Sequence, residues 1–275
     1  MGDNVTRFIL KIGKQNFWQR WALLFLLSMV IANPVAYAKK TVSALTFNLL
    51  YDSVHSKQSM NLIKKLSSDI VCLTELTPVF SRKFTKKFSR LYQYRAFYAK
   101  RGTWGIGIAS RYPIVKSKIF PIKPHRIPGV EAVIKIGKHQ LLVSCVHLFP
   151  PGAKRKKSDS LWASIKKNTQ LRVYQVKYLQ RKYRYWKKSI LLLGDMNESR
   201  SGRAMKFLLK SGYQHACQMA SKSQCGATYP GATSRLPAVI EIDHILGRKL
   251  EFVSARVVKG GGSDHYPVTA KFIIR

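Results

Sequence analysis

The chain has 275 residues, of which 46% are hydrophobic, so it has enough apolar side chains for a folded core and is not disordered throughout. Lys and Arg number 49 against 12 Asp and Glu, a formal net charge of +37. A field of that size attracts polyanions such as nucleic acid or an anionic membrane, although a generally basic proteome would produce the same excess.

Residues 1–38 have the pattern of a secretory signal peptide. Basic residues precede a charge-free apolar run from Trp21 to Ala32, and Ala36-Tyr37-Ala38 follows as an A-x-A cleavage pattern. The run is shorter than the ~20 residues that span a bilayer comfortably. We therefore expect export to the periplasm or the medium, with one mature domain at 39–275; an uncleaved membrane anchor and a buried helix are the alternatives. The segment carries only +3, so about +34 belongs to the mature chain.

From Thr41 onward, short apolar runs alternate with segments of helical spacing. This alternation, without repeats or a low-complexity linker, predicts one layered α/β domain. A long helix is expected to begin at a cap on Asp159 or Ser160 and to run to about Lys188. The other expected helices are 60–66, 79–92 and 204–211. The expected strands are 42–48, 70–73, 105–109, 130–136, 140–147, 190–193, 239–246, 253–258 and 266–274.

The four cysteines fall into two kinds of context. Cys217 and Cys225 lie close together in a loop-like stretch and are placed to pair in an oxidising compartment. Cys72 and Cys145 lie within apolar strand patterns, which favours buried thiols, with a bridge between them as the alternative.

Acidic residues are few, and several follow apolar strands directly. Glu75, Asp195 and Asp264 come at or near expected strand ends, where side chains reach solvent from a fixed backbone, and Asn48 ends another strand. Oxygen donors at such positions are typical ligands of Mg²⁺.

The other polar residues at strand ends suit proton transfer and phosphate binding. Asp195 and Asn197 are two residues apart, so they face the same side of an extended strand. His265 adjoins Asp264, and Asp243 is placed to orient it and to favour its charged form. His147 is a second imidazole at a strand end. Each motif by itself is weak, since G-D-x-N often marks a turn and Ser-Asp-His a helix cap.

Together and in order, these motifs resemble the endonuclease/exonuclease/phosphatase superfamily, which includes deoxyribonuclease I-like nucleases. The resemblance spans about 43–271 and implies a layered sandwich of two packed mixed β-sheets flanked by helices. The motifs that carry it are Thr46-Phe47-Asn48, Leu73-Thr74-Glu75-Leu76, 107–114, Val146-His147-Leu148, Gly194-Asp195-Met196-Asn197, Ile242-Asp243-His244-Ile245 and 263–268.

The resemblance also implies roles for the site residues. Glu75 would be the principal ligand of Mg²⁺, with Mn²⁺ as a substitute, and Asn48 and Asp264 would lie nearby. The resemblance further implies that Asp195 and Asn197 position water and phosphate, and that His147 and the pair of His265 with Asp243 flank the scissile phosphate. In one respect the chain departs from the family: nucleases resembling deoxyribonuclease I place a Glu beside the equivalent of His147, but 76–130 contains no acid. This leaves a general-acid role for His147 in doubt and favours a hydrogen-bond donor.

The substrate is not fixed by such a fold. An exported nuclease is the first hypothesis, supported by the charge and by the basic–aromatic segment 181–188. The second is a phosphatase or phosphodiesterase that acts on a lipid-linked phosphate at an anionic membrane, as in the small bacterial branch that includes VanJ-type wall-lipid phosphatases. A non-catalytic binding protein is the third, and a solvated helix face would explain 181–188 equally well. We expect a monomer.

Overall fold

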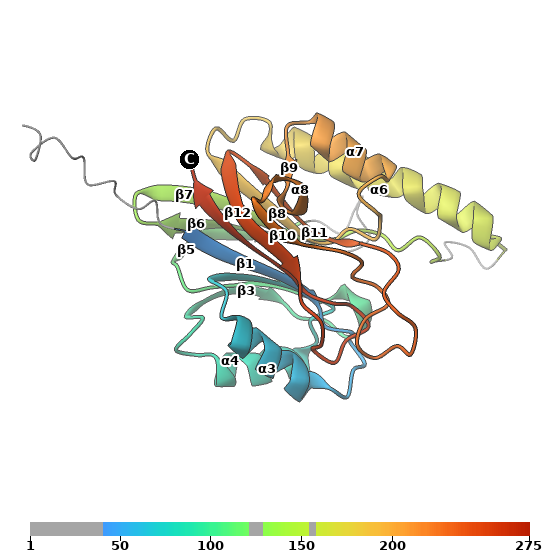
Figure 1. The fold of residues 1–275 in the computed structure, drawn as a ribbon, viewed down its shortest axis with the longest axis horizontal. Coiled ribbons are helices and arrows are strands. Elements are labelled where there is room, and N and C mark those ends of the chain that lie inside the picture. Colours follow the sequence, from blue (N-terminus) through green and yellow to red (C-terminus); the bar gives the residue numbers. More distant parts are fainter. Residues whose placement is uncertain (1–40, 121–128, 154–157) are drawn as a thin grey trace, which may run out of the picture. The chain divides into compact units, whose positions relative to one another are not determined.

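Two mixed β-sheets with helices on their outer faces form the structure, a computed structural model that describes residues 41–120, 129–153 and 158–275 (Figure 1). The expected fold class is confirmed. The expected signal peptide lies outside the described residues. The seven-stranded sheet has the order β10 (Lys222–Gln224), β12 (Leu250–Val257), β13 (Val268–Ile274), β1 (Thr41–Asn48), β2 (Ile70–Thr74), β4 (Ile106–Ser110) and β3 (Tyr94–Tyr98). The six-stranded sheet has the order β5 (Ile114–Ile119), β6 (Val130–Ile136), β7 (His139–His147), β8 (Ser189–Asp195), β11 (Asp243–Arg248) and β9 (Gln214–His215).

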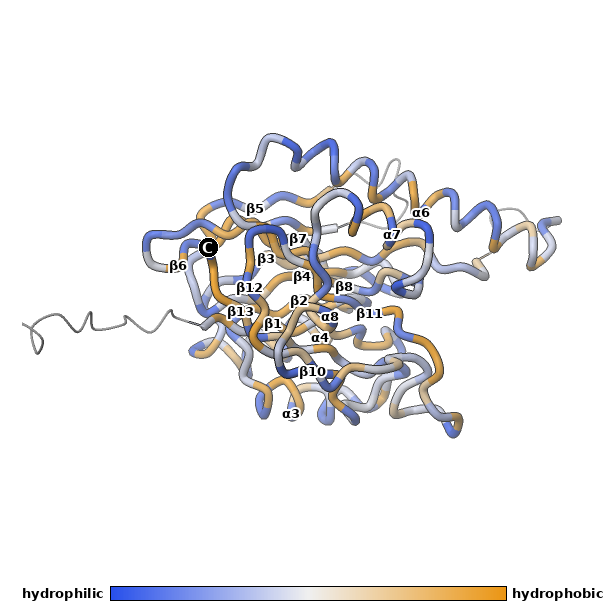
Figure 2. The backbone as a smooth tube through the Cα atoms, turned by 45° about the horizontal axis from the view of Figure 1, so that its top comes forward, coloured by the Kyte–Doolittle hydropathy of each residue, from blue (hydrophilic) through white to orange (hydrophobic). Residues whose placement is uncertain are grey.

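The helices cover the outer face of each sheet. One cluster of buried side chains packs α3 (Ser56–Leu66) and α4 (Pro78–Lys87) on the seven-stranded sheet. Another packs α6 (Leu161–Tyr183) and α7 (Arg203–Lys210) on the six-stranded sheet. Hydrophobic and hydrophilic colours alternate along α6 in Figure 2, as expected of a helix with one face on a sheet. The short helices are η1 (Gly102–Trp104) and α8 (Ala216–Met219).

Several expected boundaries move. α4 ends at Lys87 rather than at 92, although its aromatic face is buried as expected. α6 is capped by Ser160, whose Oγ accepts a hydrogen bond from the Ala163 amide, and it ends at Tyr183 rather than near Lys188. The chain before Asp243 is a loop rather than part of the strand expected at 239–246. The expectations missed β3, whose side chains are partly buried, and β5, whose side chains are mostly exposed; neither strand shows a continuous apolar run.

A disulfide joins the two sheets through the core. Cys72 on β2 and Cys145 on β7 are bonded, so buried thiols were the wrong choice for this pair. Both side chains face the space between the sheets, a contact between distant strands that sequence spacing does not reveal. The second bridge joins Cys217 to Cys225, as their spacing indicated.

Strand pairing places the ends of several strands at one edge. β1 and β2 are parallel, with Asn48 opposite Thr74, and β7 and β8 are parallel, with His147 opposite Asp195. β11 runs antiparallel to β8 and begins there, with Asp243 opposite Asp195. We call this the site edge. In the part of the chain that the structure describes, no helix is long and apolar enough to cross a membrane.

Candidate active site

Asp195, the last residue of β8, lies at the centre of the polar residues on the site edge. Its Oδ2 accepts a hydrogen bond from Nδ2 of Asn48 at 3.1 Å. The same oxygen lies 3.4 Å from Nε2 of His147 and 3.8 Å from Nε2 of His265. All four side chains are buried. One carboxylate thus connects residues from β1, β7 and the loop before β13, which the sequence separates by up to 217 positions.

Gly194 allows this close approach of β7 and β8. A Cβ at Gly194 would come within 1.8 Å of the Val146 carbonyl oxygen, so any larger residue would push the two strands apart. Because His147 and Asp195 directly follow these two residues, the glycine brings the imidazole within reach of the carboxylate.

Glu75 lies beside this centre, where its largely buried side chain borders a cavity. Its Oε1 accepts from Asn48 Nδ2 at 3.3 Å, and its Oε2 accepts from the Tyr51 amide at 3.0 Å. The backbone of Glu75 is left-handed, with a φ of +56°, and Asn197 is similar at +49°. Such conformations cost energy in residues other than glycine and tend to gather at functional sites.

His265 forms a buried ion pair with Asp243. Nδ1 of His265 lies 2.8 Å from Oδ2 of Asp243. Burial by itself would lower the pKa of His265, but the charges of Asp243, Asp195 and Asp264 outweigh it and raise the pKa to about 10. The imidazole is therefore a cation near neutral pH, with its Nε2 directed toward Asp195.

His147 holds a ring nitrogen without a partner. Its Nδ1 is buried and accepts or donates no hydrogen bond among the described residues, while Nε2 faces Asp195. Among the described residues, no carboxylate is hydrogen-bonded to Nδ1, and the stretch 76–130 contains no acid.

The two remaining predicted residues lie at the margins of the site. Asn197 is partly exposed, and its Nδ2 donates to the Leu148 carbonyl at 3.0 Å while its amide donates to Asp195 Oδ1 at 2.8 Å. Asp264 is also partly exposed. Burial raises the pKa of Asp264, the His265 charge opposes this, and the Glu75 charge adds to it.

The oxygen donors around Glu75 suit a hard cation better than the buried group beside them. Asp195, Asp243 and His265 have ligand atoms within 4.8 Å of one another, but His265 already pairs with the Asp243 carboxylate through Nδ1. Glu75 instead lines a cavity of about 560 Å³, which leaves room for the waters that Mg²⁺ retains. Asn48 turns its amide nitrogen toward both carboxylates, and its Oδ1 accepts from the Leu50 amide at 3.1 Å. Direct ligation by Asn48 would require the amide to rotate.

One functional residue escaped the site prediction. Thr228 is buried, and its Oγ1 accepts hydrogen bonds from the amides of Ile242 and Asp243 at 3.1 and 3.2 Å, which fixes the start of β11. The following residue, Tyr229, places its ring 5.1 Å from the ring of His265. The stretch that contains Thr228 and Tyr229 shows no strand or helix periodicity, and the proline after Tyr229 was its one distinctive feature in the sequence.

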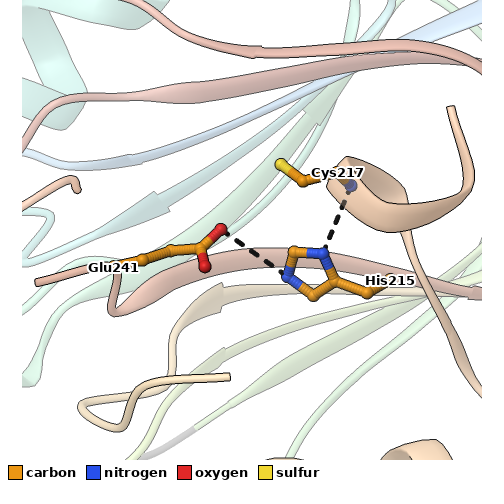
Figure 3. A group of neighbouring side chains, drawn as sticks. All are labelled: His215, Cys217 and Glu241. Atoms are coloured by element: carbon orange, nitrogen blue, oxygen red, sulfur yellow. Dashed lines mark hydrogen bonds and ion pairs between the residues drawn. The ribbon is translucent and has the colours of Figure 1, made fainter. Parts of the chain in front are cut away.

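A second group of potential ligands lies away from this centre. Figure 3 shows the His215 ring between the Glu241 carboxylate and the backbone of Cys217. Nε2 of His215 lies 2.9 Å from Nδ1 of His244, and Nδ1 accepts from the Cys217 amide at 3.2 Å. Both ring nitrogens are therefore occupied, and the Cys217 sulfur is bonded to Cys225. This group is not arranged to hold a metal.

Comparisons with known proteins agree with this fold. A model of the Endonuclease/Exonuclease/phosphatase family matches residues 45–265. A search of curated proteins found no match. Among solved structures, an endonuclease/exonuclease/phosphatase from Bacteroides vulgatus has 16% identity and a TM-score of 0.70 over 86% of this chain and 100% of its own. A functionally unknown conserved protein from Enterococcus faecalis V583 has 15% identity and a TM-score of 0.69, covering 85% and 100%. D. rerio TDP2, complexed with a single-strand DNA product, has 15% identity and a TM-score of 0.65, covering 85% and 99%. At these identities the structures show a shared fold.

Proposed function

Because this chain belongs to the endonuclease/exonuclease/phosphatase family, whose members are hydrolases of phosphoric esters, we propose that it is a divalent-cation-dependent phosphoesterase. The observation that carries the proposal is the position of Asp195. Its carboxylate lies within 4 Å of Asn48, His147 and His265, with Glu75 and its cavity alongside.

The residues divide the work by charge. Attack of water on phosphorus forms one P–O bond and breaks the bond to the leaving oxygen, with negative charge on the remaining oxygens. Asp195 Oδ2 accepts the proton of the attacking water. His265, held as a cation by Asp243, binds a phosphoryl oxygen through Nε2. His147 donates a hydrogen bond from Nε2 to the scissile phosphate. The backbone amide of Asn197 keeps the Asp195 carboxylate oriented.

The cation would be held by Glu75 with Asp264, and Asn48 would connect Glu75 to Asp195. Mg²⁺, with Mn²⁺ as a substitute, fits this oxygen-rich and open donor set. When bound, it would neutralise charge on the phosphoryl oxygens.

Two substrate classes are supported by different observations. Nucleic acid is supported by the net charge of +37 and by the solved D. rerio TDP2 relative, which holds single-strand DNA. A lipid-linked phosphate is supported by exposed aliphatic side chains around the site, described below. Segment 181–188 favours neither, because it lies at the far end of α6: Tyr183 is buried and Trp186 donates to the carbonyl of Ser189, the first residue of β8.

One set of assays tests the reaction and ranks the substrates. The purified chain is incubated with plasmid DNA, RNA, a polyprenyl pyrophosphate and sphingomyelin, each with Mg²⁺ or with EDTA. We expect hydrolysis of one class with Mg²⁺ only, and a loss of about 10²–10⁴-fold in Asp195→Ala. The Lys206→Ala variant, on the outer helix α7, serves as the matched control. No hydrolysis of any ester would contradict the reaction, and full activity in Asp195→Ala would contradict the site.

A further inference from the structure

Exposed apolar side chains gather at the site edge. Among the described residues, five large hydrophobic side chains are more than 70% exposed: Val54 at 87%, Trp162 at 80%, Val239 at 75%, Tyr185 at 73% and Leu236 at 71%. Four of the five belong to segments that leave the site edge, and we call Val54, Trp162, Leu236 and Val239 the apolar rim. Large apolar side chains exposed on one edge of a domain are candidates for an interaction surface.

Chain connections place the rim around the catalytic centre. Val54 lies between the end of β1, at Asn48, and the start of α3. Leu236 and Val239 lie in the loop that ends at Asp243. This loop lies against the catalytic residues, since a Cβ at Gly231 would come within 2.6 Å of the His265 backbone.

Trp162 reaches the same side at the end of α6. Arg172 of α6 donates to the carbonyl of Phe149, two residues beyond His147, which fixes the level of the helix at the site edge. Ten residues earlier in the helix, at a rise of 1.5 Å per residue, Trp162 lies about 15 Å farther out along the axis. Figures 1 and 2 both show this end of α6 extending past the sheets.

Positive charge accompanies the rim. Arg235 is exposed beside Leu236, and Lys166 is exposed one turn after Trp162. Arg82, Lys83 and Arg101 line the cavity that Glu75 shares, where Asp52 is the other acid. Side chains that enter a bilayer interface are thus combined with cations that pair with anionic headgroups.

We propose that the apolar rim docks on the surface of an anionic lipid bilayer and that the site hydrolyses a phosphate ester carried by a lipid there. Three members of the rim are aliphatic. Single-stranded nucleic acid binds by stacking its bases on aromatic side chains, and its charged backbone gains nothing from Val54, Leu236 or Val239. An acyl-chain boundary removes these side chains from water while the nearby cations remain with the headgroups.

The inference rests on the proposed phosphoesterase function only for its second half, because docking requires no catalysis. A tryptophan placed in the rim reports on insertion through quenching by brominated acyl chains, whatever other part of the chain contacts the membrane. We choose Leu236→Trp for the rim and Tyr185→Trp as the matched control, since both positions are similarly exposed and Tyr185 follows the C-terminal end of α6, away from the end that carries Trp162.

The full chain is mixed with brominated vesicles that contain either phosphatidylglycerol with phosphatidylcholine, or phosphatidylcholine alone. We expect at least twofold stronger quenching of the added fluorescence in Leu236→Trp than in Tyr185→Trp, and less quenching on neutral vesicles. In the native chain, Trp162→Phe is expected to reduce quenching more than Trp186→Phe does.

Equal quenching in the two added-tryptophan variants, or no quenching at position 236, would overturn the docking surface. Perturbation of the tryptophan at 236 by single-stranded DNA, without quenching by vesicles, would assign the rim to nucleic acid and also overturn the inference. If the rim docks but lipid-linked phosphates in the same vesicles are not hydrolysed while DNA is, the substrate assignment fails and the phosphoesterase function stands. If no ester is hydrolysed, the proposed function fails independently of docking.

Discussion

Two buried pairs of side chains contain histidine, one inside the site and one behind it. Neighbouring residues of β11 contribute to both pairs, but the charge of the imidazole differs between them. Asp243 pairs with His265, whose pKa is raised to about 10. The next residue, His244, pairs with His215, and burial lowers their pKa values to about 4 and about 3. Successive residues of a strand face opposite sides, so Asp243 points between the sheets and His244 toward the helices.

The difference shows that burial does not by itself decide the charge of an imidazole. Burial opposes the charged form in both pairs, and a dedicated carboxylate reverses the outcome in only one. Glu241 lies 3.9 Å from His215 Nε2, but it pairs more closely with Arg200, at 3.1 Å, and does not keep the pKa of His215 from falling. The first pair is thus suited to bind an anion and the second to hold the backbone.

The hydrogen bonds of the second pair run in one direction toward the loop between β8 and α7, which we call the catalytic loop because it contains Asn197. The Glu198 carbonyl only accepts, so His244 must donate to it from Nε2, at 2.9 Å. Nδ1 of His244 is then an acceptor for His215 Nε2, and Nδ1 of His215 accepts from the Cys217 amide. The neutral pair therefore connects the Cys217–Cys225 loop to the residue after Asn197.

The largest expected difference between the pairs is in activity. His265→Ala removes the cation that would hold the phosphoryl oxygen, and we expect kcat/KM to fall by about 10²–10⁴-fold with Mg²⁺. His215→Ala leaves the His265–Asp243 pair in place and should lower kcat/KM by less than about tenfold. Steady-state kinetics on the preferred ester measures both. Similar losses in the two variants would remove the functional distinction between the pairs.

The pairs also predict opposite effects of pH on stability. Folded His215 and His244 titrate near pH 3 and 4, but near 6.5 when unfolded, so the unfolded chain binds more protons between these values. The free energy of unfolding should therefore fall as pH drops from about 6.5 toward 4, by up to about 1.4 kcal/mol per pH unit for each histidine. The raised pKa of His265 stabilises the fold fully below about pH 6.5, and this contribution is lost as pH rises through about 10.

Urea unfolding at several pH values, with EDTA present so that no cation perturbs His265, measures both effects. In the variant His215→Gln/His244→Gln, the free energy of unfolding should depend less on pH on the acid side (the acid limb) only. In His265→Gln, it should depend less on pH on the alkaline side only. An acid limb that is unchanged in the double variant would show that other groups govern it.

The sequence identified the charged pair and not the neutral one, for a physical reason. Asp243 and His265 belong to two of the ordered motifs that carry the family resemblance, although the strand expected at 239–246 begins only at Asp243. The apolar runs at 70–73 and 190–193 predicted β2 and β8 well. His215 lies in a two-residue strand with no periodic pattern, and its partner is 29 positions away. The Cys72–Cys145 bridge was only the alternative for similar reasons, because contacts between sheets depend on packing that local spacing does not encode. The roles of the individual site residues stay predictions until variants are measured.

A smaller effect is expected on the stability of the neutral pair. His215→Ala leaves His244 Nδ1, which is buried, without a donor and the Cys217 amide, which is part-buried, without an acceptor. We expect the free energy of unfolding at pH 7 to fall by about 1–3 kcal/mol. Chemical denaturation measures the change, and Lys206→Ala on the exposed face of α7 should leave it within about 0.5 kcal/mol. A neutral result for His215→Ala would show that the link to Glu198 does not stabilise the fold.

The smallest expected effects distinguish the hydrogen bond of His215 Nε2 from that of His215 Nδ1. The amide nitrogen of a glutamine reaches roughly as far as Nε2, so His215→Gln keeps a donor for His244, while the oxygen of His215→Asn lies near Nδ1 and keeps an acceptor for Cys217. Because the bond to His244 continues to the catalytic loop, His215→Gln should retain native kcat/KM and lose less than about 1 kcal/mol of stability. His215→Asn should retain the disulfide-loop contact but match His215→Ala in kcat/KM. The reverse order would place the coupling to the site in the Cys217–Cys225 loop rather than in His244.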